Sequence, residues 1–224
     1  MYFGLSEDQI FFQDNVKKFL EDNAPLDVIR NISKGENPNQ KNEIHSGIIN
    51  LGINNILVPE EHGGLGLDLL FAAAISQSIG EAVAPLPYCG SYVMAPIAIQ
   101  IGASKSQKEN IFNEMSSGNT KFGIAFSEYF GSRDSSSINF SNEKINGKTI
   151  FAIDCDYATD VLVSDASGKI GIVSIEDKNI EIVDLITVDK TRTYKEIKFS
   201  NANVEILANT KNSTDGIEKA LDAG

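Results

Sequence analysis

The sequence predicts an α+β protein in which an all-helical N-terminal domain precedes an antiparallel β-barrel domain and the chain ends at the start of a further helix. Two observations lead to this fold class. Apolar residues recur at helical spacing over residues 6–117. After Gly118 the apolar period changes to two, and Val, Ile and Phe occupy most of the apolar positions. We therefore expect a helical domain over 1–118, a β-barrel domain over 119–210 and the start of a C-terminal helical domain over 211–224.

The helical half begins with a capping box, because the Ser6 hydroxyl can accept from the Gln9 amide while the Gln9 side chain bonds back. Asp68 provides a second N-cap, ahead of a long helix with few charges that we expect to be buried. The polar stretch 31–42, which contains Gly and Pro, is predicted to be a loop. The expected helices run from Ser6 to just before Pro25, through 44–51, and over 69–84, 92–100 and 105–115.

Short apolar segments separated by Gly, Asn, Asp and Ser make up the second half and predict a barrel or a sandwich. The dipeptide Asn146-Gly147 is the strongest local turn signal among them. A last helix through Ile217 and Leu221 is too short to be stable without a partner, and we expect its apolar face to lack one. The predicted strands cover residues 122–128, 148–153, 160–163, 170–175, 180–185, 194–199 and 204–207.

The composition argues against several kinds of partner and site. Of 224 residues, 19 are Lys or Arg and 31 are Asp or Glu, and the resulting net charge of −12 repels nucleic acid and anionic membranes. No apolar run is long enough to span a bilayer and the first residues lack the features of a secretory signal, so we expect a cytoplasmic protein. The cysteines Cys89 and Cys155 cannot form a disulfide framework, and with two histidines in the chain we expect no metal site.

Three local motifs allow either a catalytic or a structural interpretation. The Gly-Gly-Leu-Gly segment 63–66 can cradle an anion or form a tight turn; we favour the turn, because no strand precedes it and the third glycine of a dinucleotide-binding loop is missing. Residues 102–106 lack the last glycine of a hydrolase nucleophile elbow and are better explained as a helix start. His62 can serve as a general base or lie on the surface beside Glu60 and Glu61, and we favour the surface position.

Six stretches of the sequence resemble, in order, the acyl-CoA dehydrogenase family, and together they span about residues 3–210. The most specific is the segment 58–66, VPEEHGGLG, which is similar to the family's VPEE-x-GG-x-G turn. The segment 125–128, AFSE, resembles the family's A-x-[TS]-E strand, and 145–151, INGKTIF, resembles its I-N-G-x-K-x-[WF] hairpin. The remaining similar stretches lie at residues 3–9, 102–118 and 189–199.

This resemblance implies a flavoprotein that binds FAD between its middle β domain and its C-terminal helical domain. In that family two strands flank the flavin ring, and they correspond here to Phe126 and Ser127 in one segment and to Phe151 and Ile153 in another. The hydroxyl of Ser132 corresponds to one that contacts the FAD pyrophosphate. Ile153 stands where the family has threonine, so a side-chain hydrogen bond to the flavin is lost there while the backbone N–H remains.

The family's catalytic base is a glutamate on its C-terminal domain. None of Glu60, Glu61, Glu81 and Glu128 corresponds to it, so no catalytic residue is named in this chain. The resemblance implies an FAD-dependent acyl-CoA dehydrogenase of fatty acid metabolism, which oxidises an acyl-CoA thioester between its α and β carbons and passes the electrons to a separate acceptor. A homo- or hetero-oligomer is expected. Two alternatives share the fold: a non-catalytic partner subunit or pseudoenzyme, and a flavin monooxygenase.

Overall fold

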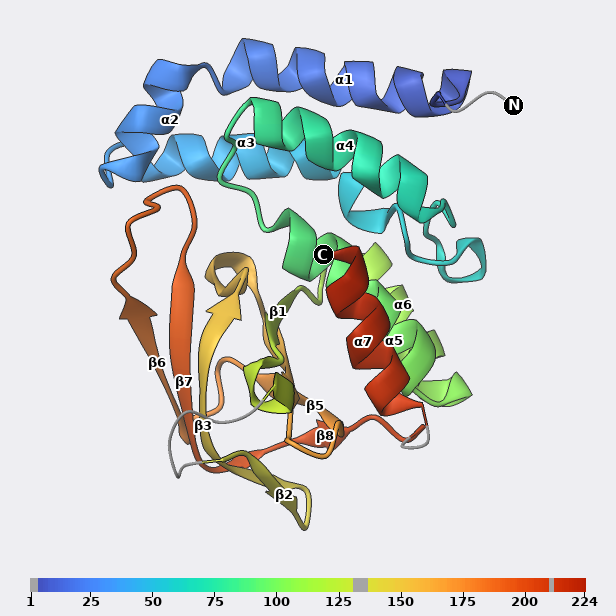
Figure 1. Ribbon diagram of the computed structural model, residues 1–224, viewed down its shortest axis with the longest axis vertical. Helices are drawn as coiled ribbons and strands as arrows, with labels where there is room; N and C mark the ends of the chain where they lie inside the picture. Colours follow the sequence, from blue (N-terminus) through green and yellow to red (C-terminus); the bar gives the residue numbers. More distant parts are fainter. Residues whose placement is uncertain (1–3, 131–136, 210–211) are drawn as a thin grey trace.

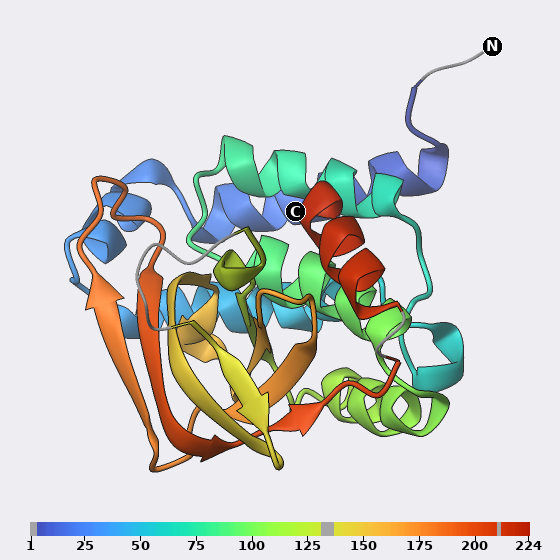
Figure 2. The ribbon, with the colours of Figure 1, turned by 60° about the horizontal axis from the view of Figure 1, so that its bottom comes forward.

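The computed structural model describes residues 4–130, 137–209 and 212–224. Helices fill the first half, an eight-stranded sheet forms most of the second half, and a final helix returns to the helical side (Figure 1). Figure 2 shows the sheet strongly curled, with the helices gathered on one side of it. The predicted α+β fold class, with helices before strands and a helix at the end, is confirmed. Among the described helices, none combines the length and apolarity needed to cross a bilayer.

The first helices are more numerous than the sequence suggested, because a helix that was not predicted lies between the two expected ones. Helix α1 (Glu7–Asn23) begins with the expected capping box, in which the Gln9 amide donates to the Ser6 hydroxyl at 3.2 Å. Helices α2 (Leu26–Ser33) and α3 (Pro38–Asn50) follow, so the loop predicted over 31–42 is wrong along most of its length. Pro38 is the reason, because proline at the first position of a helix favours its start and does not break it.

Two of the remaining helices, α4 and α6, begin at the predicted caps, whereas the helix expected over 92–100 is a π-helical segment followed by an α-helix that begins at Ala95. The Asp68 carboxylate accepts from the amides of Leu70 and Phe71 and so caps α4. Ser104 forms a second capping box with Gln107 at the start of α6. These elements are α4 (Leu69–Glu81), a π-helical segment (Tyr88–Met94), α5 (Ala95–Gly102) and α6 (Lys105–Ser116).

The strands pair in the order β6-β7-β3-β1-β4-β5-β8, with β2 beside β3. All of these pairs are antiparallel except β1 with β4, which run parallel. The sheet is therefore mainly antiparallel, as predicted, with one parallel pair at its centre. Its strands are β1 (Phe122–Ala125), β2 (Asn139–Ser141), β3 (Lys144–Ile153), β4 (Asp160–Ser164), β5 (Ile170–Ser174), β6 (Ile180–Leu185), β7 (Tyr194–Asn203) and β8 (Glu205–Ile206).

The predicted turn at Asn146-Gly147 is wrong. The β2–β3 hairpin turns instead at Asn142 and Glu143, whose φ angles of 51° and 57° fit a type I′ turn. Gly147 lies inside β3 at φ 117°, where a Cβ atom would come within 2.4 Å of the carbonyl oxygen of Ser137. Glycine is thus needed there for the close approach of another segment, and the same residue type that signals a turn serves packing.

Three apolar clusters hold the protein together, and the second joins its helical and β parts. That cluster includes Ala98 and Ile99 of α5, Phe122 of β1, and Ile217 and Ala220 of the last helix, α7 (Ser213–Ala223). The expectation that α7 exposes an unpartnered apolar face is therefore wrong. The apolar surface of α5 covers that face, and Figure 1 shows the two helices side by side.

Candidate functional site

The candidate site lies where β1 ends beside β3. Strand β1 is shorter than predicted and stops at Ala125, after which Ser127–Phe130 forms a 3-10 turn. The antiparallel pair Ile124↔Ile153 sets the register between the two strands. The hydroxyl oxygens of Ser127 and Thr149 lie 2.9 Å apart and link this turn to β3. Thr149 is fully buried and Ser127 is half-buried, so the serine is the member of the pair that reaches toward the surface.

A β-bulge directly after Thr149 in β3 contains an exposed aromatic residue, Phe151. Thr149 pairs with Ile197 and Ala152 with Lys195, so Ile150 and Phe151 both stand opposite a single residue of β7. Phe151 has a left-handed φ of 57°, and 47% of its surface is exposed. Because β1 and β3 are antiparallel in this register, Phe151 lies across from the end of β1, beside the turn that begins at Ser127.

The other residues expected at a flavin site lie deeper or outside the described part. The side chain of Phe126 is 3% exposed and belongs to the second apolar cluster, so only its backbone is available to a ligand. Ile153 is partly buried against the same cluster. Ser132 lies outside the described residues. Of the expected residues, Phe151 is exposed and Ser127 half-buried, whereas the side chain of Phe126 is buried and Ile153 is partly buried.

Sequence reasoning missed Thr149, which lies within a predicted strand but was not singled out. The only available signal was a threonine in an otherwise apolar strand, two residues before the aromatic position.

Glu128, which follows Ser127, is 4% exposed, and its carboxyl group therefore lies in the interior.

The remaining motifs have structural roles. The segment 63–66 forms the expected tight turn, in which a Cβ atom on Gly64 would lie 2.0 Å from the carbonyl oxygen of Val58. His62 is more buried than expected, because its ring stacks on Phe112 at a centroid distance of 5.5 Å and only 13% of its side chain is exposed. No group of three or more His, Cys, Asp or Glu side chains suited to a metal ion occurs among the residues that the structure describes.

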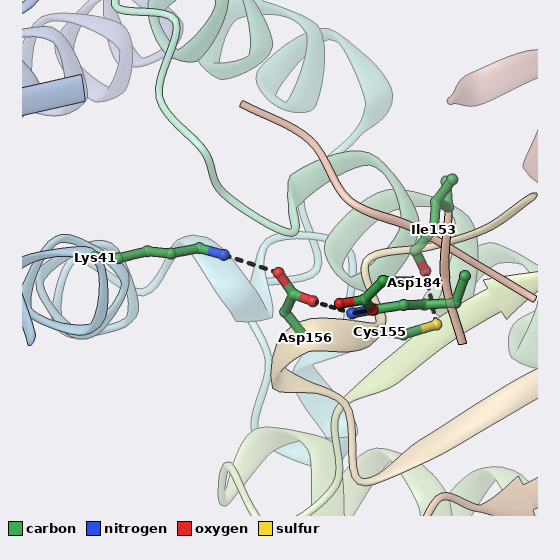
Figure 3. A network of polar contacts seen from close by, with 6 residues as sticks. Lys41, Ile153, Cys155, Asp156 and Asp184 are labelled. Carbon is green, nitrogen blue, oxygen red and sulfur yellow. Dashed lines mark hydrogen bonds and ion pairs between the residues drawn. The ribbon is translucent and has the colours of Figure 1, made fainter. Parts of the chain in front are cut away.

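The turn after β3 carries two carboxyl groups whose pKa values shift in opposite directions. Burial raises the pKa of Asp154 to about 6, against the effects of the Gly90 amide and the Arg192 guanidinium. Partial burial also acts to raise the pKa of Asp156, but hydrogen bonds from Lys195 and Lys41 outweigh it and lower the value to about 2. Figure 3 shows Lys41 directed at one carboxylate oxygen of Asp156, and the ammonium group of Lys195 lies 2.8 Å from the other.

Comparison with known proteins gives one family match and many similar structures. Residues 6–119 match the family described as Acyl-CoA dehydrogenase, N-terminal domain. The chain is 27% identical over 183 residues to the probable acyl-CoA dehydrogenase YngJ of Bacillus subtilis, a match that covers 75% of this chain and 46% of that protein. The chain therefore spans about half the length of this curated relative.

Solved structures of low sequence identity share the whole fold. One chain of the ChsE4-ChsE5 complex from Mycobacterium tuberculosis superposes with a TM-score of 0.82 at 18% identity. The match covers 100% of the present chain and 62% of the chain from the complex. An acyl-CoA dehydrogenase complexed with FAD from Bacillus anthracis superposes with a TM-score of 0.77 at 15% identity, over 98% of this chain and 40% of that chain. At these identities the likeness concerns the fold.

Proposed function

Because the chain belongs to the acyl-CoA dehydrogenase family, we propose that it binds FAD and serves in the α,β-dehydrogenation of an acyl-CoA thioester. The observation that carries this proposal is the hydroxyl pair of Ser127 and Thr149 between the end of β1 and β3, the strand that also exposes Phe151. Bound FAD would supply the hydride acceptor for such a reaction. The Bacillus anthracis relative complexed with FAD supports the choice of cofactor.

The residues at this edge of the sheet fit a flavin ring chemically. Thr149 is fully buried, so it can donate its proton to Ser127 and leave the Ser127 hydroxyl free to donate toward a ligand. A donor that a hydrogen bond fixes to β3 does not need to reorganise when negative charge develops on the ligand. The exposed ring of Phe151 offers an apolar surface on which an aromatic ring system can pack.

We assign no catalytic base to this chain. Glu128 is buried at 4% exposure, and the surface acids Glu60, Glu61 and Glu81 belong to other elements than β1 and β3. In the proposed reaction the electrons pass to a separate acceptor. The protein works in an oligomer, and the complex of ChsE4 with ChsE5, which shares the fold, supports this part of the proposal. In this proposal the chain contributes one wall of the flavin site.

A titration with FAD tests the proposal. The protein, purified at its natural length, is expected to bind FAD with a change in flavin absorbance and fluorescence. Ser127→Ala is expected to weaken FAD binding by about 1 kcal/mol, or about fivefold, the usual contribution of one hydrogen bond. Ser200→Ala, which changes an exposed serine of β7, is the matched control and should bind as the wild type does. A wild-type protein that takes up no FAD would refute the proposal and favour the non-catalytic partner subunit.

A further inference from the structure

The turn after β3, residues 154–157, connects the strand that carries Phe151 to β4. Asp154 has a left-handed φ of 57°, which bends the chain sharply at the end of the strand. The Cys155 thiol then donates to the carbonyl oxygen of Ile153 at 3.4 Å and closes the bend. A short 3-10 helix over Cys155–Tyr157 follows. This geometry leaves both Asp154 and Asp156 directed at neighbouring elements.

The Asp154 carboxyl group accepts hydrogen bonds from the π-helical segment (Tyr88–Met94) of the first half. Its Oδ2 atom accepts from the backbone N–H of Gly90 at 2.6 Å, and the amide of Ser91 also donates to the carboxyl group. A Cβ atom at position 90 would lie 2.8 Å from the same Oδ2 atom. A side chain at position 90 would therefore displace the Asp154 carboxylate from its present position.

Asp156 forms ion pairs with two further elements, and one of its partners is in turn paired with a third (Figure 3). Its two carboxylate oxygens lie 2.8 Å from the ammonium groups of Lys41 in α3 and Lys195 in β7. Lys195 also pairs with Asp184 in β6. Only 12–26% of the side chains of Lys41, Asp156 and Lys195 is exposed, so these pairs are less screened by solvent than ordinary surface pairs.

Strand β1 packs against the same turn from another side. A Cβ atom on Gly123 would come within 2.5 Å of the Cys155 sulfur and 3.2 Å of the Ile153 carbonyl oxygen. The turn is therefore held by α3, the π-helical segment, β1 and β7 together. Two of these elements belong to the helical half and two to the sheet.

We propose that Asp154 and Asp156 are positioning residues that fix the end of β3, and with it Phe151, against the helical half of the protein. This inference rests on the proposed flavin function. Phe151 lies three residues before Asp154, and strand residues advance about 3.3 Å each, so a displaced turn moves the ring within the same site. Neither carboxylate touches the ligand. Their role is to hold the end of β3, which carries Phe151, in position for the ligand.

Hydrogen exchange on the ligand-free protein tests the anchoring without any flavin. Lys41→Met removes one partner of Asp156, and we expect the amides of residues 151–153 to exchange about tenfold faster. The matched control is Lys17→Met, which breaks the Lys17–Glu81 pair between α1 and α4, a contact of 3.6 Å between half-exposed side chains. Unchanged exchange at 151–153 in the Lys41 variant, or an equal change in the control, would overturn the proposal.

Flavin binding then tests whether the anchor positions the site. Asp154→Asn keeps an oxygen acceptor for the Gly90 amide and is expected to bind FAD within about twofold of wild type, whereas Asp154→Ala is expected to bind about tenfold more weakly. The circular dichroism of the bound flavin should change in the alanine variant and recover in the asparagine variant. An alanine variant with wild-type affinity and dichroism would overturn the positioning role. If the wild-type protein binds no FAD, the proposed function fails, while the exchange experiment still decides whether the turn anchors β3.

Discussion

Ionisation of Asp154 should destabilise the folded protein as the pH rises from about 4 to about 6. Burial raises the pKa of this carboxyl group from 3.8 to about 6 in the folded state. The folded state therefore holds its proton more tightly than the unfolded state does. The protonated Asp154 carboxyl group therefore contributes its full stabilisation below its unfolded-state pKa of 3.8. This contribution is lost as the pH rises through its folded-state pKa of about 6. A difference of this size corresponds to at most about 3 kcal/mol of unfolding free energy.

The wild-type pH profile alone would hide this effect, because His45 acts in the opposite direction. Burial, with the charges of Lys121 and Lys41, lowers the pKa of His45 from 6.5 to about 4, so its contribution to stability is lost as the pH falls through that range. The informative quantity is therefore a difference between two proteins that share His45. Asp154→Asn keeps the shape of the side chain and cannot ionise.

Urea unfolding of both proteins at a series of pH values provides the measurement. The unfolding free energy of Asp154→Asn relative to wild type should rise by up to about 3 kcal/mol between about pH 4 and pH 7. Asp14→Asn, an exposed change on α1, is the control and should give a nearly flat difference. A difference for Asp154→Asn that does not vary with pH would refute the assignment of a raised pKa to this group.

Three further predictions concern stability, each measured by denaturant unfolding. Phe112→Ala removes a fully buried ring and should cost about 3–5 kcal/mol; a loss below about 1 kcal/mol would contradict its place in the core. Gly64→Ala would place a methyl group 2.0 Å from the Val58 carbonyl oxygen and should destabilise by more than about 1 kcal/mol, whereas Gly80→Ala, exposed on α4 with open space around it, should stabilise by about 0.5–1 kcal/mol. Ser104→Ala removes the cap of α6 and should cost about 1 kcal/mol, and equal stability to wild type would exclude that cap as a contributor.

Features that depend on a few neighbouring residues could be predicted from the sequence. Ser6 and Ser104 cap their helices through residues three positions away, and Asp68 does so within its first turn. The change of apolar period after Gly118 likewise reflects a local property, the alternation of side chains along a strand. These signals were enough for the fold class, because each helix start and each strand is encoded within its own segment.

The composition of the candidate site was only partly predictable. The segments containing Ser127 and Phe151 could be identified by resemblance, but their surroundings could not. Phe151 reaches the surface because two residues of β3 stand opposite one residue of β7, and a bulge of this kind depends on the partner strand. Thr149 becomes the partner of Ser127 because of the register between β1 and β3, which no local pattern contains.

The sequence by itself determined the fold class, helices before strands with a helix at the end, because hydrophobic period and capping act over a few residues. The tertiary structure alone decided which of these local signals prevail. Asn146-Gly147 carries a strong turn signal, yet pairing of β3 with β7 holds Gly147 inside a strand opposite Phe199. Asp154 meets Gly90 across 64 positions of sequence. Such contacts form only when the whole chain has folded, because their energy comes from burial and close approach between segments that are distant in the sequence.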